Sequence, residues 1–158
     1  MKSMIIVSIV FLGSFLSGCA TQEYNTATGK EDIIFVDTQK EVNIGKNIAE
    51  SIEKSKEIKL DPDPLMTERV NNVGKKIAAV SDRKEVKYSF RVIDKEDVNA
   101  FALPGGYVFV FKGLVDKVSS DDELAGVIAH EIAHVVARHS VKRLQGSVGY
   151  DILMILMA

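Results

Sequence analysis

The feature that most constrains this chain is a short stretch, residues 130–134, which reads His-Glu-Ile-Ala-His. Residues four apart lie on one face of an α-helix, so His130 and His134 can direct two imidazole nitrogens at a single ion. Glu131 is rotated by about 100° from His130 and lies beside such an ion, where its carboxylate can accept a proton from water. This spacing is typical of a catalytic zinc site. The sequence therefore predicts one zinc ion bound by His130 and His134, with Glu131 as the general base.

The flanking residues predict that this stretch lies on a helix from about Asp121 to about Gln145. Ser120 and Glu123 have the spacing of a capping box at its start. Apolar residues then recur at helical spacing without an interrupting proline. An ordinary core helix that carries two histidines by chance is the alternative. Buried histidines need polar partners, however, and a metal ion supplies one.

The N-terminus carries the pattern of a bacterial lipoprotein signal. Lys2 precedes an apolar stretch at residues 4–16 that is too short for a comfortable membrane span. The stretch runs into Leu-Ser-Gly-Cys-Ala, which resembles a lipobox that ends at Cys19. We therefore expect residues 1–18 to be a signal peptide and Cys19 to carry the lipid. A plain secretory signal or a short membrane anchor is the alternative.

The position after the cysteine and the overall charge bear on location and partners. Ala20 favours an outer-membrane lipoprotein that faces the periplasm, if the cell is Gram-negative. Cys19 is the only cysteine, so no intrachain disulfide can form. A net charge of -2 gives no support for a nucleic-acid partner. We expect a polar tether at residues 19–36 and one globular domain at residues 37–158.

The domain reads as two helices followed by a small sheet, which is an α+β arrangement. The charges on both helices are expected to be solvated. Pro104-Gly105-Gly106 breaks the pattern, because its glycines allow positive φ, although composition alone also fits an ordinary hairpin turn. The predicted helices span residues 38–57 and 65–80, and the predicted strands span residues 86–92, 98–103 and 107–111.

Two blocks of sequence together resemble a known family. Residues 99–110 read Asn-Ala-Phe-Ala-Leu-Pro-Gly-Gly-Tyr-Val-Phe-Val, and residues 122–134 read Asp-Glu-Leu-Ala-Gly-Val-Ile-Ala-His-Glu-Ile-Ala-His. In this order and spacing they closely resemble the zinc metallopeptidases of the HtpX, Oma and CAAX prenyl protease type. The lipobox makes the chain most similar to the periplasmic lipoprotein members of the BepA and LoiP kind.

The resemblance implies a zincin-like metallopeptidase domain, with a small sheet packed on the metal helix. It assigns His130 and His134 as zinc ligands and Glu131 as general base. It also implies that the strand after Pro104 is an edge strand that holds a substrate peptide. The implied activity is a membrane-tethered zinc metalloendopeptidase acting on misfolded envelope proteins. The residues implied to contact substrate are Gly105, Gly106, Tyr107, Val108 and Phe109.

The chain departs from the family at the third zinc ligand, which the family takes from a glutamate on a later helix. No glutamate follows Glu131, and Asp151 is the only later acidic residue. On a continuous helix His139 would lie about 140° round from His134, so we expect it to be poorly placed as a ligand. The apolar run at residues 150–158 resembles a helix cut short, which predicts a domain incomplete at its C-terminus. The alternative is a chaperone-like lipoprotein that binds envelope proteins without cleaving them.

Overall fold

The computed structural model describes residues 21–25 and 29–147. The expected signal peptide, the expected lipidation site at Cys19 and the apolar run at residues 150–158 lie outside the described residues. Within the described part, no helix has both the length and the apolar character needed to cross a membrane.

The centre of the fold is a three-stranded mixed sheet with the order β3-β5-β4. Strand β5 (Tyr107–Phe111) lies in the middle, parallel to β3 (Ser89–Ile93) and antiparallel to β4 (Ala100–Leu103). The expected strand at 107–111 is confirmed with the same bounds, and the strand expected at 98–103 is confirmed but begins at residue 100. The first strand begins three residues later than its predicted start at residue 86.

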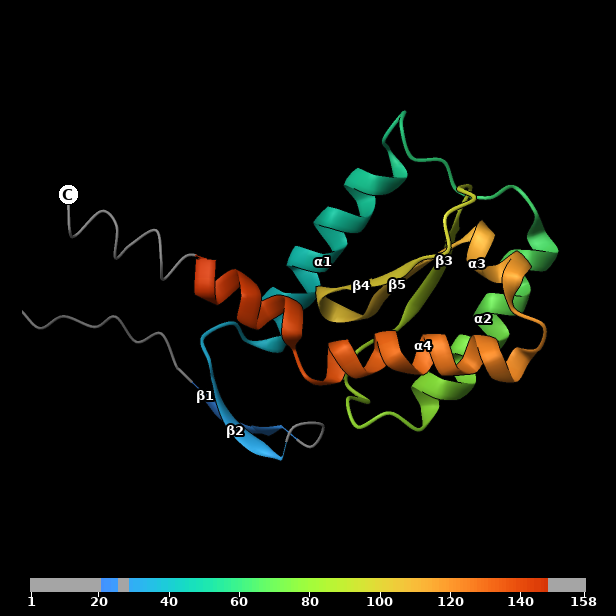
Figure 1. The fold of residues 1–158 in the computed structure, drawn as a ribbon. Coiled ribbons are helices and arrows are strands. Elements are labelled where there is room, and N and C mark those ends of the chain that lie inside the picture. The colour runs from blue at the N-terminus through green and yellow to red at the C-terminus, as the bar shows by residue number, and fades with distance from the viewer. Residues whose placement is uncertain (1–20, 26–28, 148–158) are drawn as a thin grey trace, which may run out of the picture.

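Helices cover both faces of this sheet, as Figure 1 shows. α2 (Pro64–Ala79) and α4 (Asp121–Val136) pack on one face, and α1 (Thr38–Glu53) packs on the other. A short helix, α3 (Lys112–Lys117), connects β5 to α4. The α+β fold class is therefore confirmed.

The two-faced burial of β5 follows from the period of two in a strand. Val108 and Val110 point toward α2 and α4 and are completely buried. Phe109 points the other way, toward α1, and its ring stacks on Phe101 of β4 with 5.2 Å between centroids. Because both faces are covered, the strand is apolar throughout rather than alternating.

The helix that begins at Asp121 is shorter than its sequence predicts. Ser120 caps its start, since the hydroxyl accepts a hydrogen bond from the Glu123 amide at 3.2 Å. The helix ends at Val136, and Arg138 takes a left-handed conformation with φ 51°. A second helical segment then occupies residues 139–147. The expectation of one continuous helix to Gln145 is therefore wrong, because a residue with positive φ cannot continue a right-handed helix.

The segment expected to be a polar tether contains regular structure. β1 (Thr21–Asn25) and β2 (Lys30–Ile34) pair in an antiparallel sheet of two strands. The Gln145 side chain donates to the Ile33 carbonyl at 3.3 Å and accepts from the Phe35 amide at 3.4 Å. Two strands therefore lie within the expected tether at residues 19–36, and the chain at the end of β2 is hydrogen-bonded to the 139–147 segment.

Close backbone contact sets the position of α1 against the end of β4. Gly45 lies so near Pro104 that an added Cβ would stand 1.8 Å from the Pro104 carbonyl oxygen. Gly105 and Gly106 have φ values of 72° and 90°, which confirms the expectation that these glycines provide positive φ.

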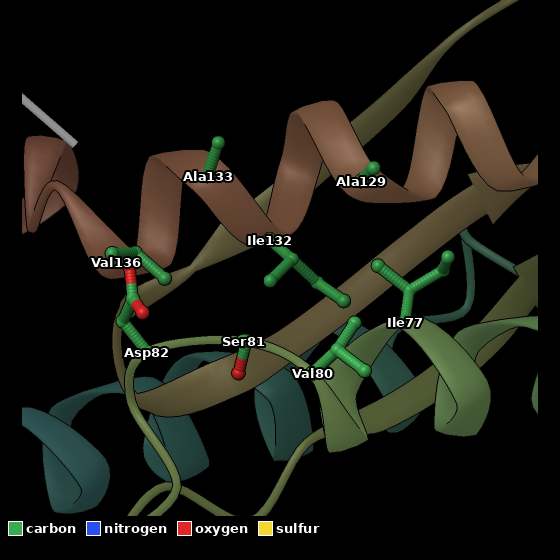
Figure 2. A pocket seen from close by; sticks show the side chains of 8 residues that line it. All are labelled: Ile77, Val80, Ser81, Asp82, Ala129, Ile132, Ala133 and Val136. Atoms are coloured by element: carbon green, nitrogen blue, oxygen red, sulfur yellow. The ribbon is translucent and has the colours of Figure 1, made fainter.

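A shallow hollow of about 230 Å³ lies where the end of α2 meets α4. Figure 2 shows Ile132 of α4 directed toward Ile77 and Val80, with Ser81 and Asp82 in the loop beside them. The hollow is mostly apolar and shares no lining residue with the hollow that contains His134.

Candidate metal centre

His130 and His134 lie one turn apart on α4 and point the same way. Their rings meet edge to face, with 4.6 Å between centroids and an interplanar angle of 78°. His130 is exposed and His134 is half-buried. Glu131 is 8% exposed. The helix thus presents two imidazoles with a buried carboxylate beside them, as the sequence predicts.

Glu131 and His134 open into a hollow of about 230 Å³ that lies against β4. Ala100, Phe101 and Ala102 of β4 form one wall. β4 is the last strand of the sheet, and among the described residues only β5 pairs with it. Glu131 and His134 therefore face the edge strand of the sheet, whereas His130 does not line this hollow.

The expectation that the strand after Gly105 and Gly106 is the edge strand is wrong. That strand, β5, is the central strand, and it pairs with β3 on one side and β4 on the other. Tyr107, Val108 and Phe109 thus belong to a strand whose backbone already has two strand partners, and none of these residues lines the hollow with His134. The sequence could not reveal this, because pairing order depends on topology rather than on local pattern.

His139 lies next to His134, contrary to the expectation from a continuous helix. The Nδ1 atoms of the two rings are 2.6 Å apart, and the ring centroids are 4.9 Å apart. The helix break at Arg138 turns the chain and brings His139 into the same hollow as Glu131. His139 is therefore a site residue that helical geometry alone misses.

The break at Arg138 is held by a buried carboxylate from α1. Glu41 is 1% exposed and accepts hydrogen bonds from Arg138 Nε at 2.9 Å, Arg83 Nη1 at 2.9 Å and the Gly105 amide at 3.1 Å. Arg83 also donates to the carbonyl of Val135 in the last turn of α4, at 3.2 Å. We call these four residues, Glu41, Arg83, Gly105 and Arg138, the Glu41 cluster.

The Glu41 cluster contradicts the expectation that charges on the first helix are solvated. Glu41, Gly45 and Ala49 form the buried stripe of α1, at a spacing of four residues. Small residues four and eight positions after Glu41 let this face of the helix pack closely, so that the carboxylate becomes buried. This pattern is the sequence signal that the analysis of charge alone missed.

The charges in and around the Glu41 cluster shift the pKa values of Arg83, a member of the cluster, and of its neighbour Glu85 in opposite directions. Burial opposes the charge on Arg83, but hydrogen bonds and Coulombic attraction from Glu41 and Glu85 outweigh it and raise the pKa of Arg83. Partial burial opposes ionisation of Glu85. The Arg83 hydrogen bond, a backbone hydrogen bond and nearby positive charge outweigh that effect and lower the pKa of Glu85 from its ordinary 4.5. Both groups therefore favour their charged forms.

The donor set at this site fits zinc in kind. Two imidazoles on one helix face and an adjacent carboxylate are borderline-soft and hard donors of the types that zinc accepts. Among residues 21–25 and 29–147, no group of three or more His, Cys, Asp or Glu side chains is arranged to hold a metal. The described residues thus offer two imidazoles, His130 and His134, on one helix face, whereas a catalytic zinc normally takes three ligands from the protein.

Fold and site together define a class: an α+β domain in which one helix carries paired histidines and a glutamate, and the glutamate and His134 face the edge of a mixed sheet. Comparison with known families agrees with this class. The family model "Peptidase family M48" matches residues 64–158, which is more than half of the 158 residues. The chain belongs to peptidase family M48.

Several known proteins are similar to parts of this chain. The mitochondrial metalloendopeptidase OMA1 of Schizosaccharomyces pombe is 48% identical over 75 residues, covering 48% of this chain and 22% of that protein. A putative beta-barrel assembly-enhancing protease of Vibrio cholerae is 39% identical over 83 residues, which cover 52% of this chain and 17% of that protein. OMA1 of Saccharomyces cerevisiae is 29% identical over 165 residues, which cover 93% of this chain and 48% of that protein. The chain thus spans about a fifth of the length of the first two relatives.

Proposed function

We propose that this protein is a zinc-dependent metalloendopeptidase that hydrolyses peptide bonds of unfolded or misfolded proteins. The observation that carries the proposal is the hollow in which Glu131 and His134 face the edge strand β4. His130 and His134 bind the metal through ring nitrogens, and Glu131 is the general base. Membership of peptidase family M48 and the names of the relatives, a metalloendopeptidase and a beta-barrel assembly-enhancing protease, support this assignment.

The chemistry divides between the metal and the carboxylate. Zinc, when bound, polarises the scissile carbonyl and makes a neighbouring water more acidic. Glu131 accepts a proton from the attacking water and transfers it to the leaving amine as the bond to carbon breaks. Burial of Glu131, which is 8% exposed, keeps bulk water away from the carboxylate and strengthens its interactions.

The substrate is held in an extended form along β4. The edge of a sheet offers backbone N–H and C=O groups that can pair with a peptide. One of them, the Ala102 carbonyl, already accepts a hydrogen bond from Ser140 at 3.4 Å. A second hollow of about 480 Å³ adjoins the first and shares Ala102, Ser140 and Arg143 with it. Leu103 and Leu144 lend the second hollow its apolar character, which suits the apolar side chains that misfolded proteins expose.

The mechanism is tested with Glu131→Gln, which keeps shape but removes the proton acceptor. We expect the variant to retain zinc while chelator-sensitive cleavage of casein is lost. Asp122→Asn, an exposed carboxylate change on the same helix, is the matched control and should cleave normally. Turnover by Glu131→Gln at the wild-type rate would refute the mechanism.

The ligand assignment is tested separately with His134→Ala, which should remove bound zinc in a metal analysis. Unchanged metal content would refute the assignment. If the wild-type protein binds unfolded clients and never cleaves them, the chaperone-like alternative replaces the protease.

Location is a further part of the proposal. Residues 1–18 act as a lipoprotein signal, Cys19 carries the lipid, and the domain at 37–158 faces the periplasm from the bacterial envelope. The lipobox pattern and the bacterial origin of relatives such as that of Vibrio cholerae support this, whereas the OMA1 relatives are named mitochondrial. The anchor is tested by incorporation of labelled palmitate into the wild-type protein and into Cys19→Ala. We expect the label to be lost in Cys19→Ala, and equal labelling of the wild type and the variant would refute the anchor.

A further inference from the structure

We propose that His139 is a positioning residue for the metal site, which accepts a hydrogen bond from Nδ1–H of His134 and so directs the Nε2 lone pair of His134 toward the metal. This inference rests on the proposed zinc site. It assigns His139 a role through another residue, as a partner of a ligand rather than as a ligand.

The first argument is the proton count between the two rings. Their Nδ1 atoms are 2.6 Å apart, so one of the two must carry the shared proton. A neutral imidazole has one N–H and one lone pair. If the proton lies on His134 Nδ1, then His134 Nε2 is left with its lone pair and can bind a metal. If it lies on His139 Nδ1, a neutral His134 carries its own proton on Nε2 and cannot. Metal binding and this hydrogen bond therefore favour each other.

The second argument is that the chain is built to bring His139 to this place. On a continuous helix, His134 and His139 would lie on different faces, about 140° apart. The left-handed Arg138, with φ 51°, breaks the helix and turns His139 back over His134. Such a conformation is unfavourable for a residue with a Cβ, so neighbouring contacts must maintain it.

Those contacts come from the Glu41 cluster. The buried carboxylate of Glu41 accepts from Arg138 Nε at 2.9 Å, and the Thr38 hydroxyl accepts from Arg138 Nη2 at 3.1 Å. The side chain of Arg138 is 4% exposed. α1 thus anchors the residue that precedes His139. The conformational entropy lost in orienting His139 is therefore lost when the chain folds and not when the metal binds.

The expected size of the effect follows from other ligands of this kind. Removing the partner that orients a metal-bound histidine typically weakens metal affinity by about 10- to 100-fold. The ring of His139 is exposed, so water can replace part of its hydrogen bond. We therefore expect a loss near the lower end, about 10-fold.

The test compares His139→Leu with His139→Asn in the full chain. Leucine removes the acceptor. Asparagine replaces His139 Nδ1 with an amide oxygen at the same branch point, and so it retains a hydrogen-bond acceptor there. Zinc affinity is measured by competition with a chelator. The ring tautomers are read from nitrogen-15 spectra of histidine-labelled protein, which are simple because the chain has three histidines. Ser147→Ala, which removes one hydrogen bond at the far end of the same helical segment, is the control.

We expect weaker zinc binding in His139→Leu, near-normal binding in His139→Asn, and no change in Ser147→Ala. Without zinc, His134 should be protonated at Nδ1 in the wild type and in His139→Asn, and should lose this preference in His139→Leu. Thermal unfolding of each variant confirms that it is folded.

Wild-type affinity and an unchanged His134 tautomer in His139→Leu would overturn the inference while leaving the zinc site intact. Equal weakening in His139→Asn and His139→Leu would also overturn it, because shape rather than the acceptor would then matter. If the wild-type protein binds no zinc, the proposed site and this inference fail together.

Discussion

Replacement of Glu41 by alanine tests the most strongly buried charge among the residues that the structure describes. The substitution removes three hydrogen bonds and leaves two guanidinium groups, 4% and 8% exposed, without their shared counter-ion. A hydrogen bond to a charged group contributes about 1.5 kcal/mol to the free energy of unfolding at the lower end of its usual range, and three such bonds are lost. Removing one side of a buried ion pair costs about 3–5 kcal/mol. The two estimates agree, although Arg83 keeps a second carboxylate partner, Glu85, at 2.9 Å.

We therefore expect Glu41→Ala to lower the free energy of unfolding by about 3–5 kcal/mol, out of a typical total of about 5–15 kcal/mol. Urea unfolding followed by circular dichroism measures this, with an unchanged slope against urea as the sign that the folded state remains compact. Glu41→Gln retains one acceptor oxygen and should lose less.

Glu50→Ala is the matched control for this experiment. Glu50 lies on the same helix and pairs with Lys54 at 3.0 Å, but the pair is exposed and should contribute nothing measurable. If Glu41→Ala unfolds at the same urea concentration as Glu50→Ala, then the Glu41 cluster does not stabilise the fold and the reasoning is wrong.

Three further predictions follow from close contacts and charge. Gly45→Ala should lower stability by about 1–3 kcal/mol, because the new Cβ meets the Pro104 carbonyl. Gly126→Ala should raise it by about 0.5–1 kcal/mol, since no atom lies within 4 Å of its added Cβ and alanine favours a helix; thermal unfolding separates the two, and a loss in both would contradict the contact argument. Because the pKa of Glu85 is lowered in the folded protein, its bond to Arg83 contributes fully to stability above the ordinary pKa of 4.5. This contribution is lost as the pH falls from 4.5 through the lowered pKa. Glu85→Gln should therefore flatten the acid side of the pH–stability curve, and an unaltered acid side would count against this pair.

Local patterns in the sequence were sufficient for most of the helices and strands. The capping box at Ser120 and the alternation around Phe90 depend on residues close together in the chain, and both predictions are confirmed. The end of α4 could not be predicted in this way. Its cause is the contact between Arg138 and Glu41, which are 97 positions apart in the sequence.

The same distinction holds at the site. The sequence by itself determined that His130 and His134 share one face of a helix with Glu131 beside them, because helical periodicity is a local property. The tertiary structure alone decided that β4, rather than β5, borders the hollow, and that His139 meets His134. Strand order and the helix break both arise from packing between distant segments, and a local pattern of residues does not specify which distant segments pack together.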